Sequence, residues 1–113
     1  VSTNGERTTD DTILSTTGNT PKAAQFTVSG ANNATFSVGI SNTTLTDSNE
    51  EPMALTTFSE NSAAGATSGG NVTDGLLSSE GVQTIFLGGT LTVGSTQTAG
   101  SYDGTVTTTV QYN

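Results

Sequence analysis

Cysteine, histidine and tryptophan are absent from this chain of 113 residues, which contains only two cationic side chains. Without cysteine or histidine there is no disulfide, no thiolate or imidazole metal site, and no nucleophile that histidine activates. Ten acidic side chains give a formal net charge of −8. A chain this acidic does not neutralise a phosphate backbone, so we expect no nucleic-acid partner and no attraction to an anionic membrane surface.

Long apolar runs are also lacking. None approaches the ~18 residues that a transmembrane helix needs, so we expect no membrane insertion. Residues 1–5 lack the charged and apolar regions of a signal peptide. The length suits one domain, and we expect residues 1–113 to form it. Leu, Ile, Val and Phe make up roughly a fifth of the chain, which is close to the composition of disordered proteins, so the pattern has to decide.

The pattern that is present is an alternation of apolar and polar residues, which is typical of half-buried strands. Residues 102–112 place Tyr102, Val106, Val110 and Tyr112 on one face, and this predicts one strand with both tyrosines packed in the core. Because the opposite face carries threonine and other polar residues, we expect it to face solvent.

Two further segments alternate in the same way. Residues 25–28 and 36–40 are separated by a turn-rich linker, which predicts a β-hairpin. Residues 85–93 keep one parity across Gly88 and Gly89, which predicts a bulge or bend at this pair. Poor helix formers dominate the chain, and about seven short strands separated by turns predict an all-β sandwich. We expect a long flexible loop within residues 59–75.

The only candidate metal site is a short acidic stretch. Asp47, Glu50 and Glu51 lie with Asn49 just before Pro52. Ca²⁺ prefers about six to eight oxygen ligands of this kind, so these residues are a candidate site for weak Ca²⁺ binding. The spacing matches no EF-hand, and the alternative is a set of solvated loop carboxylates. We expect no other cofactor.

Catalysis has little chemical basis in this sequence. Two carboxylates are enough to hydrolyse a glycosidic bond, but a catalytic acid needs an apolar pocket that raises its pKa. The acids here lie among Ser, Thr, Asn and Gly, so we expect no enzyme. N-glycosylation acceptor patterns begin at Asn33, Asn42 and Asn71, although chance matches are common in a chain rich in Asn and Thr.

Two sequence patterns resemble a known family. The first is AQFTVSGA followed by ATFSV, and the second is FLGGTLTVG followed by GSYDGTV and VQYN. In this order they resemble a family of secreted bacterial domains of unknown function, which is similar in turn to spore-coat-U-type and archaic chaperone–usher pilin domains. The resemblance runs from Lys22 onward, and residues 43–77 diverge from it.

The resemblance implies an immunoglobulin-like antiparallel sandwich on the bacterial cell surface, in an extracellular location. Members of the family carry a further strand-forming segment upstream of the part that corresponds to residues 1–5. Either this segment lies outside the chain, or the sandwich lacks one strand and another chain supplies it. A donated strand fills an apolar groove and pairs a free edge, and head-to-tail repetition makes a homopolymeric filament. The first functional hypothesis is therefore a non-enzymatic, pilin-like filament subunit. The alternative is an adhesin or binding module that holds Ca²⁺ or a glycan on its loops.

Overall fold

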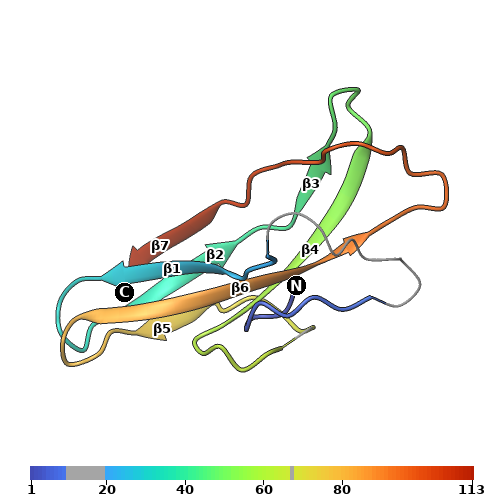
Figure 1. Cartoon of the computed structure of the whole chain (residues 1–113). Coiled ribbons are helices and arrows are strands. Elements are labelled where there is room, and N and C mark those ends of the chain that lie inside the picture. The colour runs from blue at the N-terminus through green and yellow to red at the C-terminus, as the bar shows by residue number, and fades with distance from the viewer. Residues whose placement is uncertain (10–19, 67) are drawn as a thin grey trace.

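The computed structural model describes residues 1–9, 20–66 and 68–113. All regular secondary structure in this part of the chain is β-strand (Figure 1). Within these residues no helix is long and apolar enough to cross a membrane. The strands are β1 (Ala24–Ser29), β2 (Thr35–Ile40), β3 (Thr43–Thr46), β4 (Pro52–Glu60), β5 (Asp74–Leu76), β6 (Val82–Thr92) and β7 (Thr108–Tyr112).

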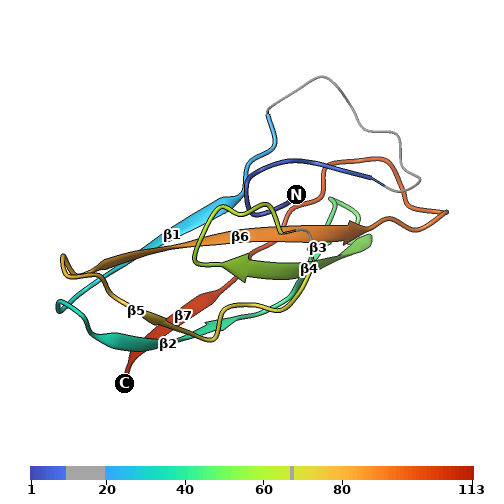
Figure 2. The ribbon, with the colours of Figure 1, turned by 90° about the horizontal axis from the view of Figure 1, so that it is seen from below.

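The strands form two antiparallel sheets that lie one above the other (Figure 2). Sheet A has the order β1-β6-β4-β3, and sheet B has the order β5-β2-β7. Every neighbouring pair is antiparallel. The prediction of an all-β antiparallel sandwich with about seven strands is confirmed.

The predicted hairpin of the first two strands is wrong. β1 pairs with β6 in sheet A, whereas β2 pairs with β5 and β7 in sheet B. The linker therefore crosses from one layer to the other. Val28 of β1 packs against the buried cluster that contains Phe36 and Val38 of β2, so the two strands meet face to face rather than edge to edge. A hairpin within one sheet and a crossing between two sheets give the same alternation of apolar and polar residues, so the pattern does not distinguish them.

Of the predicted bulge or bend at Gly88 and Gly89, the bulge is wrong. β6 runs without interruption through both glycines, and each keeps a partner in β4, with Phe58 opposite Gly88. The glycine at position 88 is explained by a close approach instead: the Val1 carbonyl oxygen and the Phe58 ring occupy the space that a Cβ atom would need.

The first residues of the chain lie on the outer face of sheet A. The Val1 amine donates to the Gly89 carbonyl at 2.7 Å, and the Gly89 amide donates to the Val1 carbonyl at 2.9 Å. Thr3 is fully buried, and its hydroxyl oxygen accepts from the amides of Gly65 and Ala66 at 3.1 and 3.0 Å. This segment therefore fastens the loop between β4 and β5 to the sheet.

The last strand is shorter than the sequence predicts. β7 begins at Thr108, and Tyr102 belongs to the connection between β6 and β7, in which Asp103 forms an isolated bridge with Thr46. The alternation across residues 102–112 thus combines a loop with a strand. The predicted long loop is found between the end of β4 and the start of β5, although residue 67 within it is outside the described residues.

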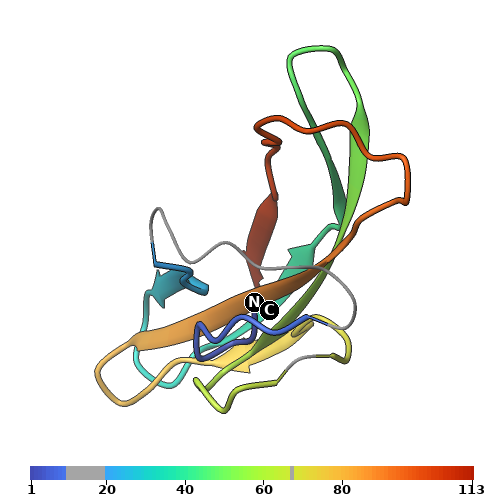
Figure 3. The same ribbon diagram turned by 45° about the vertical axis from the view of Figure 1, so that its right-hand side comes forward.

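The core between the two sheets is small. Its central cluster contains Phe36, Val38, Leu77 and Ile85. The radius of gyration is 15.8 Å and the extents are 49 × 25 × 23 Å, whereas a compact domain of this length has a radius of about 13 Å. Figure 3 shows the reason, because β3 and the adjoining half of β4 reach away from sheet B.

Candidate functional site

The four edge strands of the sandwich differ in how their free backbone groups are used. An edge strand exposes unpaired N–H and C=O groups to which another strand can be added. β3 is covered at its end, where Thr46 exchanges hydrogen bonds of 2.9 and 3.0 Å with Asp103. β5 is only three residues long, and the Leu76 amide donates to the Gln83 side-chain oxygen at 3.0 Å. These two edges are therefore partly blocked.

β7 is the edge strand whose inward-facing side chains stay exposed. Within the described ranges it pairs with β2 alone, with Tyr112 opposite Phe36 and Val110 opposite Val38. Opposite residues of an antiparallel pair point to the same face, so Val110 and Tyr112 share the inward face of two buried residues. Yet Val110 is 42% exposed and Tyr112 is 56% exposed, against 6% for Val38 and 0% for Phe36. Sheet A therefore leaves the inner face of β7 uncovered.

β1 borders the same side of the molecule. Phe26 and Val28 are half-buried on its inner face, opposite β6. The Tyr112 hydroxyl donates to the Ser29 carbonyl at 3.2 Å, and a Cβ atom on Gly30 would overlap this hydroxyl. Tyr112 thus spans from β7 to β1 at one end. We call this side, defined by Phe26, Val28, Val110 and Tyr112, the open seam.

Both tyrosines differ from the prediction that they pack in the core. Tyr112 is more than half exposed because the described part of sheet A does not reach over it. Tyr102 is half-buried in the β6–β7 connection, and its hydroxyl donates to the Thr98 carbonyl at 2.6 Å. Each hydroxyl therefore holds a backbone carbonyl at the surface rather than at the edge of the core.

The open seam is free of charge. β1, β2 and β7 contain no charged residue, although the chain as a whole carries −8. The described acidic residues lie in loops, in the N-terminal segment or at strand ends, and they are Glu6, Asp47, Glu50, Glu51, Glu60, Asp74, Glu80 and Asp103. An approaching chain therefore meets its weakest electrostatic repulsion at this side.

The acidic stretch that predicts a Ca²⁺ site forms the turn between β3 and β4. One carboxylate oxygen of Asp47 accepts from the amides of Asn49 and Glu51 at 2.9 and 2.8 Å. Glu50 has φ 63°, and its amide donates to the Asp47 carbonyl at 3.1 Å. No three acidic side chains of residues 1–9, 20–66 and 68–113 converge on a point that suits a metal ion. The structure explains Asp47 as a turn residue, which favours the alternative of solvated loop carboxylates, and Ca²⁺ binding stays untested.

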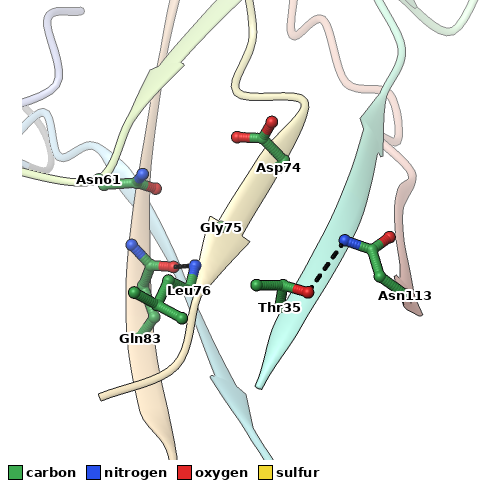
Figure 4. A pocket seen from close by; sticks show the side chains of 7 residues that line it. All are labelled: Thr35, Asn61, Asp74, Gly75, Leu76, Gln83 and Asn113. Atoms are coloured by element: carbon green, nitrogen blue, oxygen red, sulfur yellow. Dashed lines mark hydrogen bonds between the residues drawn. The ribbon is translucent and has the colours of Figure 1, made fainter. Parts of the chain in front are cut away.

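A hollow of about 430 Å³ lies beside β5 (Figure 4), lined by Thr35, Asn61, Asp74, Gly75, Leu76, Gln83 and Asn113. Two of its three amide side chains, those of Gln83 and Asn113, already have structural partners. Gln83 holds the Leu76 amide, and the Asn113 side-chain nitrogen donates to the Thr35 hydroxyl at 3.2 Å. Asp74 is the one acidic residue that lines the hollow, so the hollow does not present a pair of carboxylates. Its Gln83 side chain protects the edge of β5.

The three glycosylation patterns occupy different environments. Asn33 is exposed in the turn after β1, with φ 59°. The Asn42 side-chain oxygen accepts from the Thr57 amide at 2.9 Å, and the Asn71 side-chain nitrogen donates to the Thr57 hydroxyl at 2.9 Å. Because a glycan replaces one hydrogen of the side-chain nitrogen, modified Asn71 could not keep both its bond to Thr57 and its bond to the Ile40 carbonyl, whereas Asn33 presents its side chain to solvent.

Together these features define a class: a two-layer, all-β domain with two partly blocked edges and one uncharged, partly exposed side. The chain belongs to the family described as a domain of unknown function (DUF4402), whose profile matches residues 1–112. No curated protein and no solved structure matches the chain. Membership of a family of unknown function is thus shown, and the likeness to spore-coat-U-type and pilin domains stays a prediction.

Proposed function

We propose that this domain is a non-catalytic structural subunit of the bacterial cell surface, whose copies join into a filament by adding a β-strand at the open seam. The observation that carries this proposal is the exposure of Val110 and Tyr112 on the inward face of β7. An added strand covers such side chains and pairs the free edge at the same time.

The backbone of β7 defines how an added strand pairs. The Asn113 amide donates to the Thr35 carbonyl of β2 at 3.3 Å. Because backbone groups alternate in direction along a strand, those of Thr108, Val110 and Tyr112 point away from β2. These three residues form the row of donors and acceptors that an incoming strand meets.

The energy available from this contact comes from apolar burial and from backbone hydrogen bonds. Covering the exposed parts of Val110 and Tyr112 contributes roughly 2 kcal/mol from apolar burial. Each backbone hydrogen bond adds about 0.5–1.5 kcal/mol. A contact of this kind between unlike surfaces does not close, so head-to-tail repetition gives a filament. The acidic loops outside the seam would limit lateral association of such filaments.

Electron microscopy of the native material and of two variants tests the proposal. Val110→Glu places a charge in the seam, whereas Val82→Glu places one on the outer face of sheet A, at a residue that is 41% exposed. We expect filaments for the unsubstituted chain and for Val82→Glu, and none for Val110→Glu, with equal circular dichroism for all three monomers. The proposal is wrong if the native material forms no filaments or if Val110→Glu leaves them intact.

A further inference from the structure

We infer that in the free domain β7 pairs with β7 of a second copy, antiparallel and across a two-fold axis that passes beside Val110. This contact concerns the domain before any assembly, so it does not depend on the proposed filament. The inference combines three observations: which edge is available, how its backbone groups are directed, and where the charges lie.

The first observation is that β7 has none of the usual protection of an edge strand in the described part of the chain. Natural edge strands are shielded by charged side chains, by proline, by bulges or by a covering segment. Asp103 pairs with the end of β3, the Gln83 side chain caps β5, and the Tyr112 hydroxyl occupies the Ser29 carbonyl of β1. β7 has the sequence TTVQY, which contains no charge and no proline. Its outer edge is open to another strand.

The second observation is that β7 fits a copy of itself in one register. The strand has five residues, and the outward groups belong to its first, middle and last residues: Thr108, Val110 and Tyr112. A two-fold axis beside Val110 places Val110 opposite Val110 of the second copy and Thr108 opposite Tyr112 of the second copy. About six backbone hydrogen bonds then form. A shift by two residues leaves outward groups unpaired, and a shift by one directs them away from the partner.

The third observation is that this contact avoids charge repulsion between two acidic chains. Two copies with −8 each repel one another at most orientations. Pairing through β7 brings together strands without carboxylates, and the adjoining β2 has none either. These strands also carry no acidic side chain that a basic partner could bind. The charge pattern therefore favours a second copy of this chain over a partner of opposite charge.

The resulting dimer joins two three-stranded sheets into one sheet of six strands. The contact is isologous, so it closes and does not propagate. It also uses the edge that the proposed filament would need. A donated strand would therefore have to displace the second copy from β7. Before that step, the dimer shields the free edge of β7 from pairing with other strands. Because the contact is one short strand, we expect the dimer to dissociate on dilution.

Cysteine cross-linking tests the inferred register without a competing thiol, since the chain has no cysteine. Facing residues of a hydrogen-bonded antiparallel pair have Cα atoms about 5.5 Å apart, which suits a disulfide. We expect Val110→Cys to form a disulfide-linked dimer roughly tenfold or more faster than two control variants under mild oxidation. The controls are Val82→Cys, on the outer face of sheet A with similar exposure, and Gln111→Cys, whose counterpart in the second copy is Thr109. Equal rates for all three variants would overturn the inference.

Val110→Pro gives a second, independent test. Proline removes the outward amide of Val110 and is tolerated on edge strands. We expect sedimentation velocity to show a concentration-dependent dimer for the unsubstituted domain and a monomer for a folded Val110→Pro. A dimer that persists in Val110→Pro, or an unsubstituted domain that is monomeric at every concentration, would overturn the inference. If the native material forms filaments but Val110→Cys does not cross-link, the dimer is excluded and the proposed filament is not. If Val110→Cys cross-links but no filaments form, the proposed filament is excluded and the dimer is not.

Discussion

Replacement of Gly88 by alanine tests the packing of the N-terminal segment on sheet A. A Cβ atom at this buried position would lie 2.5 Å from Cε2 of Phe58 and would also overlap the Val1 carbonyl oxygen. Side chains do not pack this closely, so Phe58 or Val1 has to move. Val1 is held only by its two hydrogen bonds with Gly89 among the contacts described above. We therefore expect the first residues to lift from the sheet.

The expected cost follows from these contacts. Inserting one carbon into a well-packed site costs about 1–3 kcal/mol. Loss of the two Val1 hydrogen bonds adds about 0.5–1.5 kcal/mol each. A decrease of roughly 2–6 kcal/mol in the unfolding free energy is a large part of the 5–15 kcal/mol that is typical of a domain. It corresponds to a fall in the melting temperature on the order of 10 °C.

Urea unfolding followed by far-ultraviolet circular dichroism measures this effect, with Gly39→Ala as the matched control. Gly39 lies in β2, and no atom lies within 4 Å of the position that its Cβ would take. We expect Gly39→Ala to be neutral or to stabilise the domain by about 0.5 kcal/mol. If Gly88→Ala unfolds at the same urea concentration as Gly39→Ala, the N-terminal segment does not pack on β6 as described.

Three further predictions concern other polar contacts. Thr3→Val keeps the shape of a fully buried side chain but leaves two loop amides without their acceptor. We therefore expect the unfolding free energy from urea unfolding to fall by about 2–4 kcal/mol and amide exchange in the β4–β5 loop to be faster. Thr3→Ser should retain most of the stability. Asp47→Asn should lower the unfolding free energy by about 1 kcal/mol, because it weakens a carboxylate that accepts two turn amides. Excess Ca²⁺ should leave the melting temperature of the native chain unchanged; a rise that Asp47→Asn abolishes would instead establish the Ca²⁺ site. Burial, and then the charge of Arg7, lower the pKa of the Val1 amine below 8.0. The unfolded chain therefore binds more protons between the lowered pKa and 8.0, so stability should increase as the pH rises through this range, and acetylation of the amine should remove this slope.

Local pattern predicted which residues form strands and which side of each strand faces inward. Val38 and Ile85 are buried as their parity indicates, and Val110 lies on the inward face of β7. The pattern did not predict which strands are neighbours, because β1 and β2 alternate identically in a hairpin and in a crossing between sheets. That choice depends on contacts distant in sequence, such as those between β1 and β6.

Two local signals had a cause outside their own segment. The glycine pair in β6 predicts a bulge or bend, whereas Gly88 makes room for Val1 and Phe58, which are remote in sequence. The exposure of Val110 and Tyr112 depends on how far the other sheet reaches, which no local pattern encodes. Gln83 did carry a signal that the sequence interpretation missed: it is a polar residue at the same parity as the inward-facing Ile85 and Leu87, and its side chain protects the edge of β5.

Amide hydrogen exchange along β7 tests most directly the central claim that this strand gains a partner. The Val110 and Tyr112 amides point away from β2, and those of Thr109 and Gln111 point towards it. In dilute monomer we expect fast exchange for the first pair and slow exchange for the second, whereas in the assembled protein all four should exchange slowly. If the Val110 and Tyr112 amides exchange as fast in the assembly as in the monomer, no strand is added to β7 and the claim is contradicted.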